Sequence, residues 1–368
     1  MSDSILFLGS TGFVGGQVLY QLLTSPPSNV KNIIIPVSTS SKKSKVEQWI
    51  LQLQTKVETQ LPVIEREPAS NWYSQVKTLS SQVDCCIQLA TSDDLQLTRA
   101  INQGLIQGKE EFGKKGVLIH ASGVQLIESK TSGEYLETPN YNDLDPSSIA
   151  SIPDSAAHRN IDLEIEETFQ TNQLCGAIVC PALVWGKGAG PDKVVSVMIP
   201  DTVQKSLHNG KATYTGKGTN TWPAVHIEDC AELIVNLITK NLSSPHAKKN
   251  PAKFTNFYFA SYNDKLINFK HIAEVMGKAL LERGKLPTAE TISVPVPAVD
   301  PNSKGVRIED GARSQADVEV DARTPLWPCR TNVRCQANRG KEEFGWQAKK
   351  DFTDEAIRQD VFVALDNM

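Results

Sequence analysis

Short apolar runs alternate with longer stretches of helical periodicity through the first half of the chain. Each run is too short to form a helix of its own. Five of them predict buried strands: Ile5–Leu8, Asn32–Val37, Val83–Ala90, Gly116–Ser122 and Gly176–Val184. Runs without polar alternation are typical of parallel strands that are covered on both faces. We therefore expect an α/β fold with a doubly wound parallel sheet of the Rossmann type.

The pattern loosens after Trp185, where glycine and lysine cluster in Gly186–Gly190. Farther on, Glu228–Lys240 has helical periodicity, and Phe257–Ala260 predicts another strand. The stretch 285–339 contains six prolines and scattered charge, which predicts long loops. These segments favour a smaller C-terminal substrate lobe beside the sheet. The expected domains are residues 1–185 plus 223–262 for the Rossmann domain and 186–222 plus 263–368 for the lobe.

Composition narrows the class of protein without naming its chemistry. The chain has 368 residues, with 38 Lys or Arg against 42 Asp or Glu and a formal net charge of -4. This balance gives nucleic acid no positive field, and no apolar run reaches the roughly 18–20 residues that span a bilayer. The seven cysteines lack metal-site and disulfide-framework spacing, and the first residues lack the basic and apolar segments of a signal peptide. We expect a cytoplasmic enzyme, monomeric or homodimeric, with a small-molecule substrate, free thiols and no metal, nucleic-acid or membrane partner.

A glycine-rich turn separates the first predicted strand from the helical pattern that follows it. Gly9, Gly12 and Gly15 come directly after Ile5–Leu8. Glycine permits positive φ and close approach of backbone to a pyrophosphate, and the third glycine lets the helix pack on the strand. The helix N terminus offers free N–H groups and a positive dipole end. The turn predicts a dinucleotide site; a turn kept for packing alone is the alternative.

The end of the second predicted strand bears on which dinucleotide binds. An acid there would bind the ribose 2′-hydroxyl of NAD. The chain instead has hydroxyl residues from Ser38 to Ser41, then Lys42, Lys43 and Lys45, with no acid before Glu47. Hydroxyl and ammonium groups suit a 2′-phosphate, so Ser38 and Lys42 favour NADP(H) over NAD(H). A solvated basic loop is the alternative.

Six segments occur along the chain in the order of a known family: Gly9–Gly15, Leu89–Ala90, Ala121–Ser122, Cys180–Gly186, Trp222–Asp229 and Phe344–Trp346. With them the sequence resembles the extended and atypical short-chain dehydrogenase/reductases, the NAD(P)-dependent epimerase/dehydratase superfamily. The resemblance covers nearly the whole chain. The amino-acid sequences of these segments are most similar to those of fungal members.

The resemblance implies roles for residues of these segments. Backbone groups of the glycine turn would contact the pyrophosphate, and the candidates beside its glycines are Thr11, Phe13 and Val14. Leu89 and Ala90 would lie along the adenosine half of the cofactor. Pro181 would approach the nicotinamide carboxamide. Ser122 matches the catalytic hydroxyl of the family, and a strand-end serine bonded to local backbone is the alternative.

The sequence departs from the family at its acid/base pair, Tyr-x-x-x-Lys. His158 stands in place of the tyrosine and Asp162 in place of the lysine. Their spacing puts both side chains on one face of the predicted helix, where the carboxylate would orient the imidazole for acid/base catalysis. An ordinary surface pair is the alternative. Tyr135 and Tyr141 have no lysine four residues later and are expected to be surface or lid residues.

Aromatic residues of the expected lobe bear on the substrate. Trp185, Tyr214 and Trp222 are candidate substrate contacts, although each fits a core position as well. They favour an NADPH-dependent oxidoreductase of secondary metabolism that acts on a small, largely apolar carbonyl or enone. One alternative is a redox-neutral isomerase, cyclase or dehydratase that uses His158 and Asp162. Another is a non-catalytic regulator that senses NADP.

Overall fold

Seven parallel strands form the central sheet in the computed structural model, which describes residues 3–25, 27, 29–53, 60–112, 116–243, 252–263, 265–295, 323, 325 and 327–368. The order across the sheet is β3-β2-β1-β4-β5-β8-β12. The strands are β1 (Asp3–Leu8), β2 (Val30–Val37), β3 (Val63–Glu65), β4 (Cys85–Gln88), β5 (Val117–Ala121), β8 (Cys175–Pro181) and β12 (Phe257–Ala260). All neighbours pair in parallel, which confirms the predicted doubly wound sheet.

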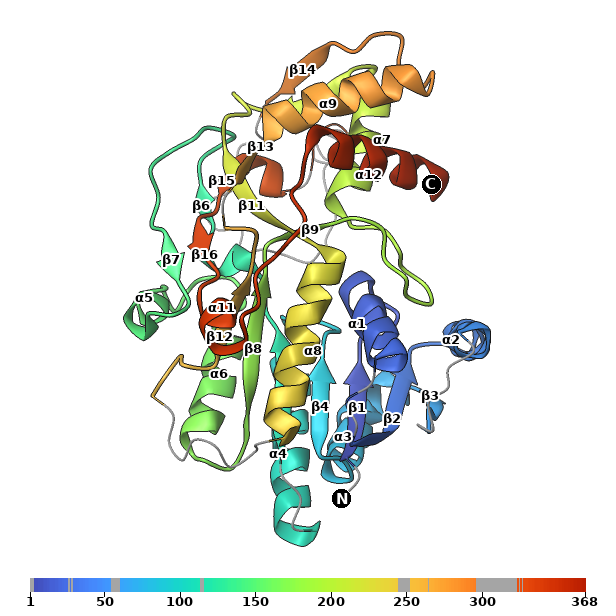
Figure 1. Cartoon of the computed structure of the whole chain (residues 1–368), viewed down its shortest axis with the longest axis vertical. Coiled ribbons are helices and arrows are strands. Elements are labelled where there is room, and N and C mark those ends of the chain that lie inside the picture. The colour runs from blue at the N-terminus through green and yellow to red at the C-terminus, as the bar shows by residue number, and fades with distance from the viewer. Residues whose placement is uncertain are drawn as a thin grey trace.

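Helices cover both faces of this sheet (Figure 1). Helices α1 and α8 pack together on one face, whereas α4 packs against α3 and α6 in the other layer. Their bounds are α1 (Phe13–Thr24), α2 (Ser40–Gln52), α3 (Ala69–Ser81), α4 (Leu95–Phe112), α6 (Arg159–Gln170) and α8 (Ile227–Ser243). Because of this double cover, the consecutive β1 residues Ile5, Leu6 and Phe7 are all fully buried although they point to alternate faces.

The C-terminal lobe lies beyond the carboxyl ends of the central strands, at the top of Figure 1. A three-stranded sheet, in the order β13-β11-β9, and a two-stranded sheet of β10 and β14 belong to it. Its elements are β9 (Leu183–Trp185), α7 (Met198–Asn209), β10 (Ala212–Thr215), β11 (Thr221–His226), β13 (Leu266–Asn268), α9 (Phe269–Glu282), β14 (Thr291–Val294) and α12 (Asp354–Asp366). The lobe therefore lies at the edge of the sheet where the glycine turn also lies.

Two short pairings connect the middle of the chain to its last forty residues. Strand β6 (Ser129–Lys130) pairs with β15 (Thr331–Asn332), and β7 (Tyr141–Asn142) pairs with β16 (Cys335–Gln336). The remaining elements beside them are η1 (Val124–Ile127), α5 (Pro146–Ala150), η2 (Trp327–Arg330) and α11 (Arg339–Phe344). Buried Asp143 accepts N–H groups of Phe259, Asn338 and Arg339. Segments inside the predicted Rossmann range thus depend on the C-terminal tail, and the predicted domain bounds stay a prediction.

Two local predictions need correction. The run 176–184 is not one strand, because it divides into β8 of the central sheet and β9 of the three-stranded sheet. Pro181 at the end of β8 has no N–H to continue the ladder. The stretch predicted as long loops contains β14, η2, β15 and β16, while residues 296–322 lie outside the described residues. All seven cysteines are free thiols, as predicted.

No helix among the described residues is long and apolar enough to cross a membrane.

Candidate active site at the carboxyl edge of the sheet

The glycine turn forms a tight backbone cradle between β1 and α1. The N–H of Gly12 donates to the carbonyl of Gly9 at 2.9 Å, and Gly9 has a φ of 90°. A Cβ on Gly15 would lie 2.1 Å from the Gly9 oxygen, so the strand and helix meet with no room for a side chain. Gly12 caps α1 without a side-chain hydrogen bond, which leaves the first N–H groups of the helix for an anion. The residues predicted to hold the pyrophosphate, from Gly9 to Gly15, therefore lie together at this helix end.

The end of β4 lies directly against the glycine turn. A Cβ on Gly9 would be 2.4 Å from the carbonyl carbon of Leu89 and 2.5 Å from the nitrogen of Ala90. The side chain of Gln88 holds this backbone, since its oxygen accepts the N–H of Ala90 at 2.8 Å. Leu89 and Ala90 therefore lie beside the glycine turn, and their contact with the adenosine half of a dinucleotide stays a prediction.

The residues predicted to select NADP lie at the start of α2. Thr39 caps the helix and accepts the N–H of Lys42 at 3.2 Å. Ser38 is exposed before the cap, and Lys42 is half-buried in the first turn. Residues with hydroxyl and ammonium groups therefore stand at a helix N terminus, which is a favourable place for a phosphate.

Ser122 and Asp162 form a buried pair at the end of β5. The Ser122 hydroxyl donates to the Asp162 carboxylate at 3.0 Å, and Asp162 is fully buried on α6. Burial raises the pKa of Asp162 to about 7, although the Ser122 hydrogen bond opposes this shift. Pro181 ends β8, the strand beside β5. Asp162, which stands at the sequence position of the family's lysine, is thus bonded to Ser122 in this chain.

His158 pairs with an acid other than the one predicted. Its Nδ1 lies 2.6 Å from Oδ1 of Asp93, whereas Asp162 bonds to Ser122. His158 is not inside the helix either: it caps α6 with a left-handed φ of 65°. Because His158 precedes the first residue of α6 and has left-handed backbone, the side-chain geometry of a helical spacing of four does not apply to it and Asp162. The partner in the predicted pairing was wrong, and Asp93 is the carboxylate that orients the imidazole.

Two residues of this cluster were missed by sequence reasoning. Asp93 lies in the loop before α4, where acids are expected only as helix caps, and its neighbour Asp94 does accept the N–H of Leu97. His120 is fully buried on β5, and neither ring nitrogen has a hydrogen-bond partner within the described residues. Burial lowers the pKa of His120 to about 3, and the nearby His158 lowers it further. A histidine inside an otherwise apolar strand is the signal that could have identified it.

The three predicted substrate residues lie in different surroundings. Trp185 is buried against the rings of His226 and Phe352, with centroids 4.5 and 4.9 Å away. Trp222 is buried and donates its indole N–H to the Thr331 carbonyl. Tyr214 is half-buried on β10, beside the ammonium of Lys270. The contacts of Trp185 and Trp222 favour a core role, and substrate contact by any of the three stays a prediction.

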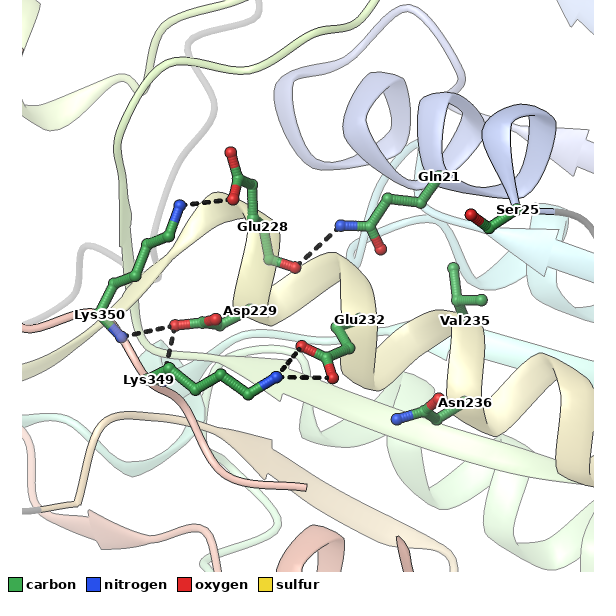
Figure 2. A pocket seen from close by; sticks show the side chains of 9 residues that line it. All are labelled: Gln21, Ser25, Glu228, Asp229, Glu232, Val235, Asn236, Lys349 and Lys350. Atoms are coloured by element: carbon green, nitrogen blue, oxygen red, sulfur yellow. Dashed lines mark hydrogen bonds and ion pairs between the residues drawn. The ribbon is translucent and has the colours of Figure 1, made fainter. Parts of the chain in front are cut away.

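A separate groove of about 400 Å³ runs along α8, and none of the predicted site residues lines it. Figure 2 shows its lining side chains, which come from α1, α8 and the segment before α12. Lys349 pairs with Glu232 at 3.0 Å, Lys350 pairs with Glu228, and Asp229 accepts the backbone N–H groups of both lysines. These charges are paired with one another, so the contacts that line the groove attach the C-terminal segment to α8.

The cradle, the buried pair and the His158–Asp93 pair meet at one edge of a fold that known proteins share. Residues 5–249 match the family described as the NAD dependent epimerase/dehydratase family. The chain belongs to this family. In the described part of this epimerase/dehydratase chain, no group of three or more His, Cys, Asp or Glu is placed to hold a metal ion.

Proteins similar to this chain include an oxidase, a dehydratase and an epimerase. A curated protein of Acremonium sp, oxidase ucsJ, is 24% identical over 247 residues, which cover 65% of this chain and 67% of the relative. A dTDP-glucose 4,6-dehydratase of Bacillus anthracis, solved in complex with NAD, superposes with a TM-score of 0.61 at 15% identity over 100% of this chain and 97% of the other. A UDP-glucuronic acid 4-epimerase of Bacillus cereus, solved with UDP-glucuronic acid and NAD, has a TM-score of 0.56 at 15% identity and covers 99% of this chain and 100% of its own. The solved structures establish the shared fold, and the family assignment makes the protein an NAD(P)-dependent enzyme.

Proposed function

We propose that the protein is an NADPH-dependent oxidoreductase that acts on a small, largely apolar carbonyl or enone. The observation that carries this proposal is the 2.6 Å contact between His158 and Asp93 beside the end of β5. In this place the family has its catalytic tyrosine. The glycine cradle, which a Cβ at Gly15 would fill, fits the close approach of a dinucleotide backbone.

The paired imidazole is the proton donor of the proposed reaction. Asp93 accepts from Nδ1 and so fixes the orientation of the ring, which leaves Nε2 for the substrate. The proton leaves from Nε2 of the imidazolium form, and the neutral ring keeps the Nδ1 proton that Asp93 accepts. The His158 side chain is 11% exposed, so the ring is held by the protein while one edge remains accessible. A reduced nicotinamide, when bound, would supply the hydride. His158 then delivers a proton to the oxygen or carbon that becomes negative.

Ser122 has a supporting role in this proposal. Its hydroxyl donates to Asp162, and the hydroxyl oxygen can in addition accept a hydrogen bond. With Asp162 buried and bonded in this way, the pair fixes the end of β5 beneath the reacting centre. No lysine stands at this position to hold the nicotinamide ribose.

The preference for NADPH rests on the start of α2. Ser38 and Lys42 present a hydroxyl and an ammonium group beside a helix N terminus, and no acid stands at the end of β2 to bind a ribose 2′-hydroxyl. A 2′-phosphate would be stabilised by all three features. Two proteins of the same fold were solved with NAD, so tighter binding of NADH than of NADPH is the result that would contradict this preference.

A redox-neutral isomerase, cyclase or dehydratase is the second candidate, and Asp162 favours it. Burial raises the pKa of this carboxyl to about 7, so protonated and ionised forms coexist near neutral pH. A carboxyl of this kind can exchange protons in both directions. In such an enzyme Asp162, Ser122 and His158 would move protons with no net change in the cofactor.

Absorbance at the NADPH band during turnover of a candidate carbonyl or enone tests the proposal. We expect the band to fall in proportion to product, and NADPH to bind more tightly than NADH. Product formed at constant absorbance would favour the redox-neutral candidate. Equal affinities for the two nucleotides would contradict the role of Ser38 and Lys42. Tight binding of NADPH with no turnover of any substrate class would favour a sensing role.

A further inference from the structure

A glycine-rich segment leaves β9 and crosses α1 toward α2. We call residues 186–194 the strap. In Figure 1 it is the yellow-green loop that follows β9 and passes above α1. Its glycines at 186, 188 and 190 fit a segment that lies close to its neighbours: Gly186 lies against the ring of His226, and Gly190 lies against the backbone of Gly16.

The strap begins at a fixed point. The N–H of Gly186 donates to both carboxylate oxygens of buried Asp360 on α12, at 3.0 and 3.1 Å. A Cβ on Gly186 would lie 2.4 Å from Nε2 of His226, and Gly186 has a φ of 96°. The start of the strap is therefore held by the C-terminal lobe.

The middle of the strap docks on the glycine turn and on α1. The N–H of Ala189 donates to the side-chain oxygen of buried Gln17 at 2.8 Å. Gly190 lies so close to α1 that a Cβ there would be 2.6 Å from the Cα of Gly16. The N–H of Lys193 donates to the carbonyl of Thr11, inside the glycine turn, at 3.3 Å. The strap thus touches the same backbone that would hold a pyrophosphate.

The far side of the strap docks on α2. The indole N–H of Trp49 donates to the Ala189 carbonyl at 3.1 Å. The ammonium of Lys45 pairs with the carboxylate of Asp192 at 2.6 Å, with side-chain exposures of 56% and 15%. The strap therefore bridges the glycine turn and α2, and the adenosine half of a dinucleotide lies between these two elements in this fold.

We propose that the strap is a clasp that retains the bound dinucleotide, with the Lys45–Asp192 ion pair as its latch. This inference rests on the dinucleotide binding of the proposed function. A nucleotide enclosed by the strap leaves only after the strap lifts from α1 and α2. Its release rate therefore depends on contacts that do not touch the nucleotide.

The opposite role for Asp192 makes an opposite prediction. If Asp192 only competed with a 2′-phosphate for Lys45, its carboxylate would weaken the binding of NADPH and leave NADH unaffected. Removing that charge would then slow the release of NADPH. A latch predicts faster release of both nucleotides, because neither the adenine nor the 2′-phosphate takes part in it.

Stopped-flow displacement of NADPH and of NADH from the full chain, wild type and Asp192→Asn, distinguishes these roles. We expect Asp192→Asn to release both nucleotides about two- to five-fold faster, the range that an exposed ion pair supplies. Added salt should speed release from the wild type and have little effect on the variant. Glu290→Gln is the matched control, since it breaks the exposed Lys211–Glu290 pair of the lobe without touching the strap.

A second variant tests the docking itself. Gly190→Ala should speed release more than Asp192→Asn does, because its Cβ would overlap with the backbone of α1. Unchanged release in both variants, or slower release of NADPH alone in Asp192→Asn, would show that the strap is no clasp while leaving the proposed function intact. A wild type that binds neither nucleotide would overturn both.

Discussion

The backbone conformation of His158 differs from that of a helical residue and belongs to the candidate site. Its φ of 65° is left-handed, a conformation that costs a non-glycine residue roughly 1–2 kcal/mol. The same residue caps α6 and directs its ring toward Asp93, which is 65 residues earlier in the sequence. Strain of this kind persists where surrounding structure imposes it, and it is common at active sites.

Replacing His158 by asparagine tests the proton donor with little change of backbone, because asparagine tolerates the left-handed region. We expect kcat to fall by about 10²–10⁴-fold, the usual contribution of a positioned acid/base group. Steady-state kinetics with the accepted substrate measure this.

The matched control is His271→Asn. His271 also pairs with an aspartate at 2.6 Å, Asp354, but its side chain is 48% exposed on α9 in the lobe. It should keep full activity. Equal activities of the wild type and the His158 variant would remove His158 from the mechanism.

Residue spacing identified His158 and Asp162 but paired them wrongly for a physical reason. A helical repeat relates residues within one element, whereas the Asp93 partner comes from the loop after a neighbouring strand. That contact depends on β4 lying beside β5, which local sequence does not encode. The conformation of the glycine turn could be predicted because the contacts of Gly12 and Gly15 with Gly9 are made within a few residues, whereas the packing of Gly9 against Leu89 is distant in sequence.

At the scale of elements, the close packing of α1 on β1 requires a residue without a side chain at Gly15. Gly15→Ala should weaken NADPH binding by about tenfold or more, because overpacking by a methyl group costs about 1–3 kcal/mol and displaces the N terminus of α1. Fluorescence titration with NADPH measures the affinity.

Gly210→Ala is the control for glycine loss in general. Gly210 has a φ of 71° at the end of α7, and a Cβ there would meet no atom within 4 Å. It should lose about 1 kcal/mol of stability from its left-handed backbone and keep its affinity for NADPH. Equal affinities of all three proteins would contradict a pyrophosphate cradle at Gly15.

Strands with long apolar runs could be predicted from the sequence, and short or divided ones could not. Strand β3 has three residues and no run to mark it. The run 176–184 contains two strands because Pro181 interrupts the ladder and β9 then pairs with β11. Strands β6, β7, β15 and β16 have two residues each, and only contacts distant in sequence define them.

At the scale of the whole molecule, buried carboxyls determine how stability varies with pH. Burial raises the pKa of Asp162 to about 7 and the pKa values of Asp143 and Asp360 to about 6. The unfolded chain ionises such groups near pH 3.9. Between about pH 4 and 7 the folded state therefore holds protons that the unfolded state releases, so these groups make stability fall as pH rises through this window.

Asp162→Asn should flatten this dependence. The free energy of unfolding, from urea titrations at pH 5 and pH 8, should fall less in the variant than in the wild type, with a difference of up to ~3 kcal/mol, because about two pKa units of the shift lie between pH 5 and the folded pKa of about 7. Asp351→Asn, at an exposed partner of Lys265, should follow the wild type. If Asp162→Asn had the same pH dependence of unfolding as the wild type, this would contradict the burial of an ionised carboxylate at position 162.

The late partners of β6 and β7 impose an order on how the newly made chain folds. The central sheet is complete once β12 has left the ribosome, but β15 begins only at Thr331. At about 5–20 residues per second, synthesis of the intervening chain takes several seconds. During that interval the nascent chain has two unpaired strand edges and an Asp143 carboxylate that lacks the N–H groups of Asn338 and Arg339. A chaperone that binds nascent chains at the ribosome would therefore encounter this chain with its central sheet formed. Strands β6 and β7, on the left in Figure 1, would still lack their partners.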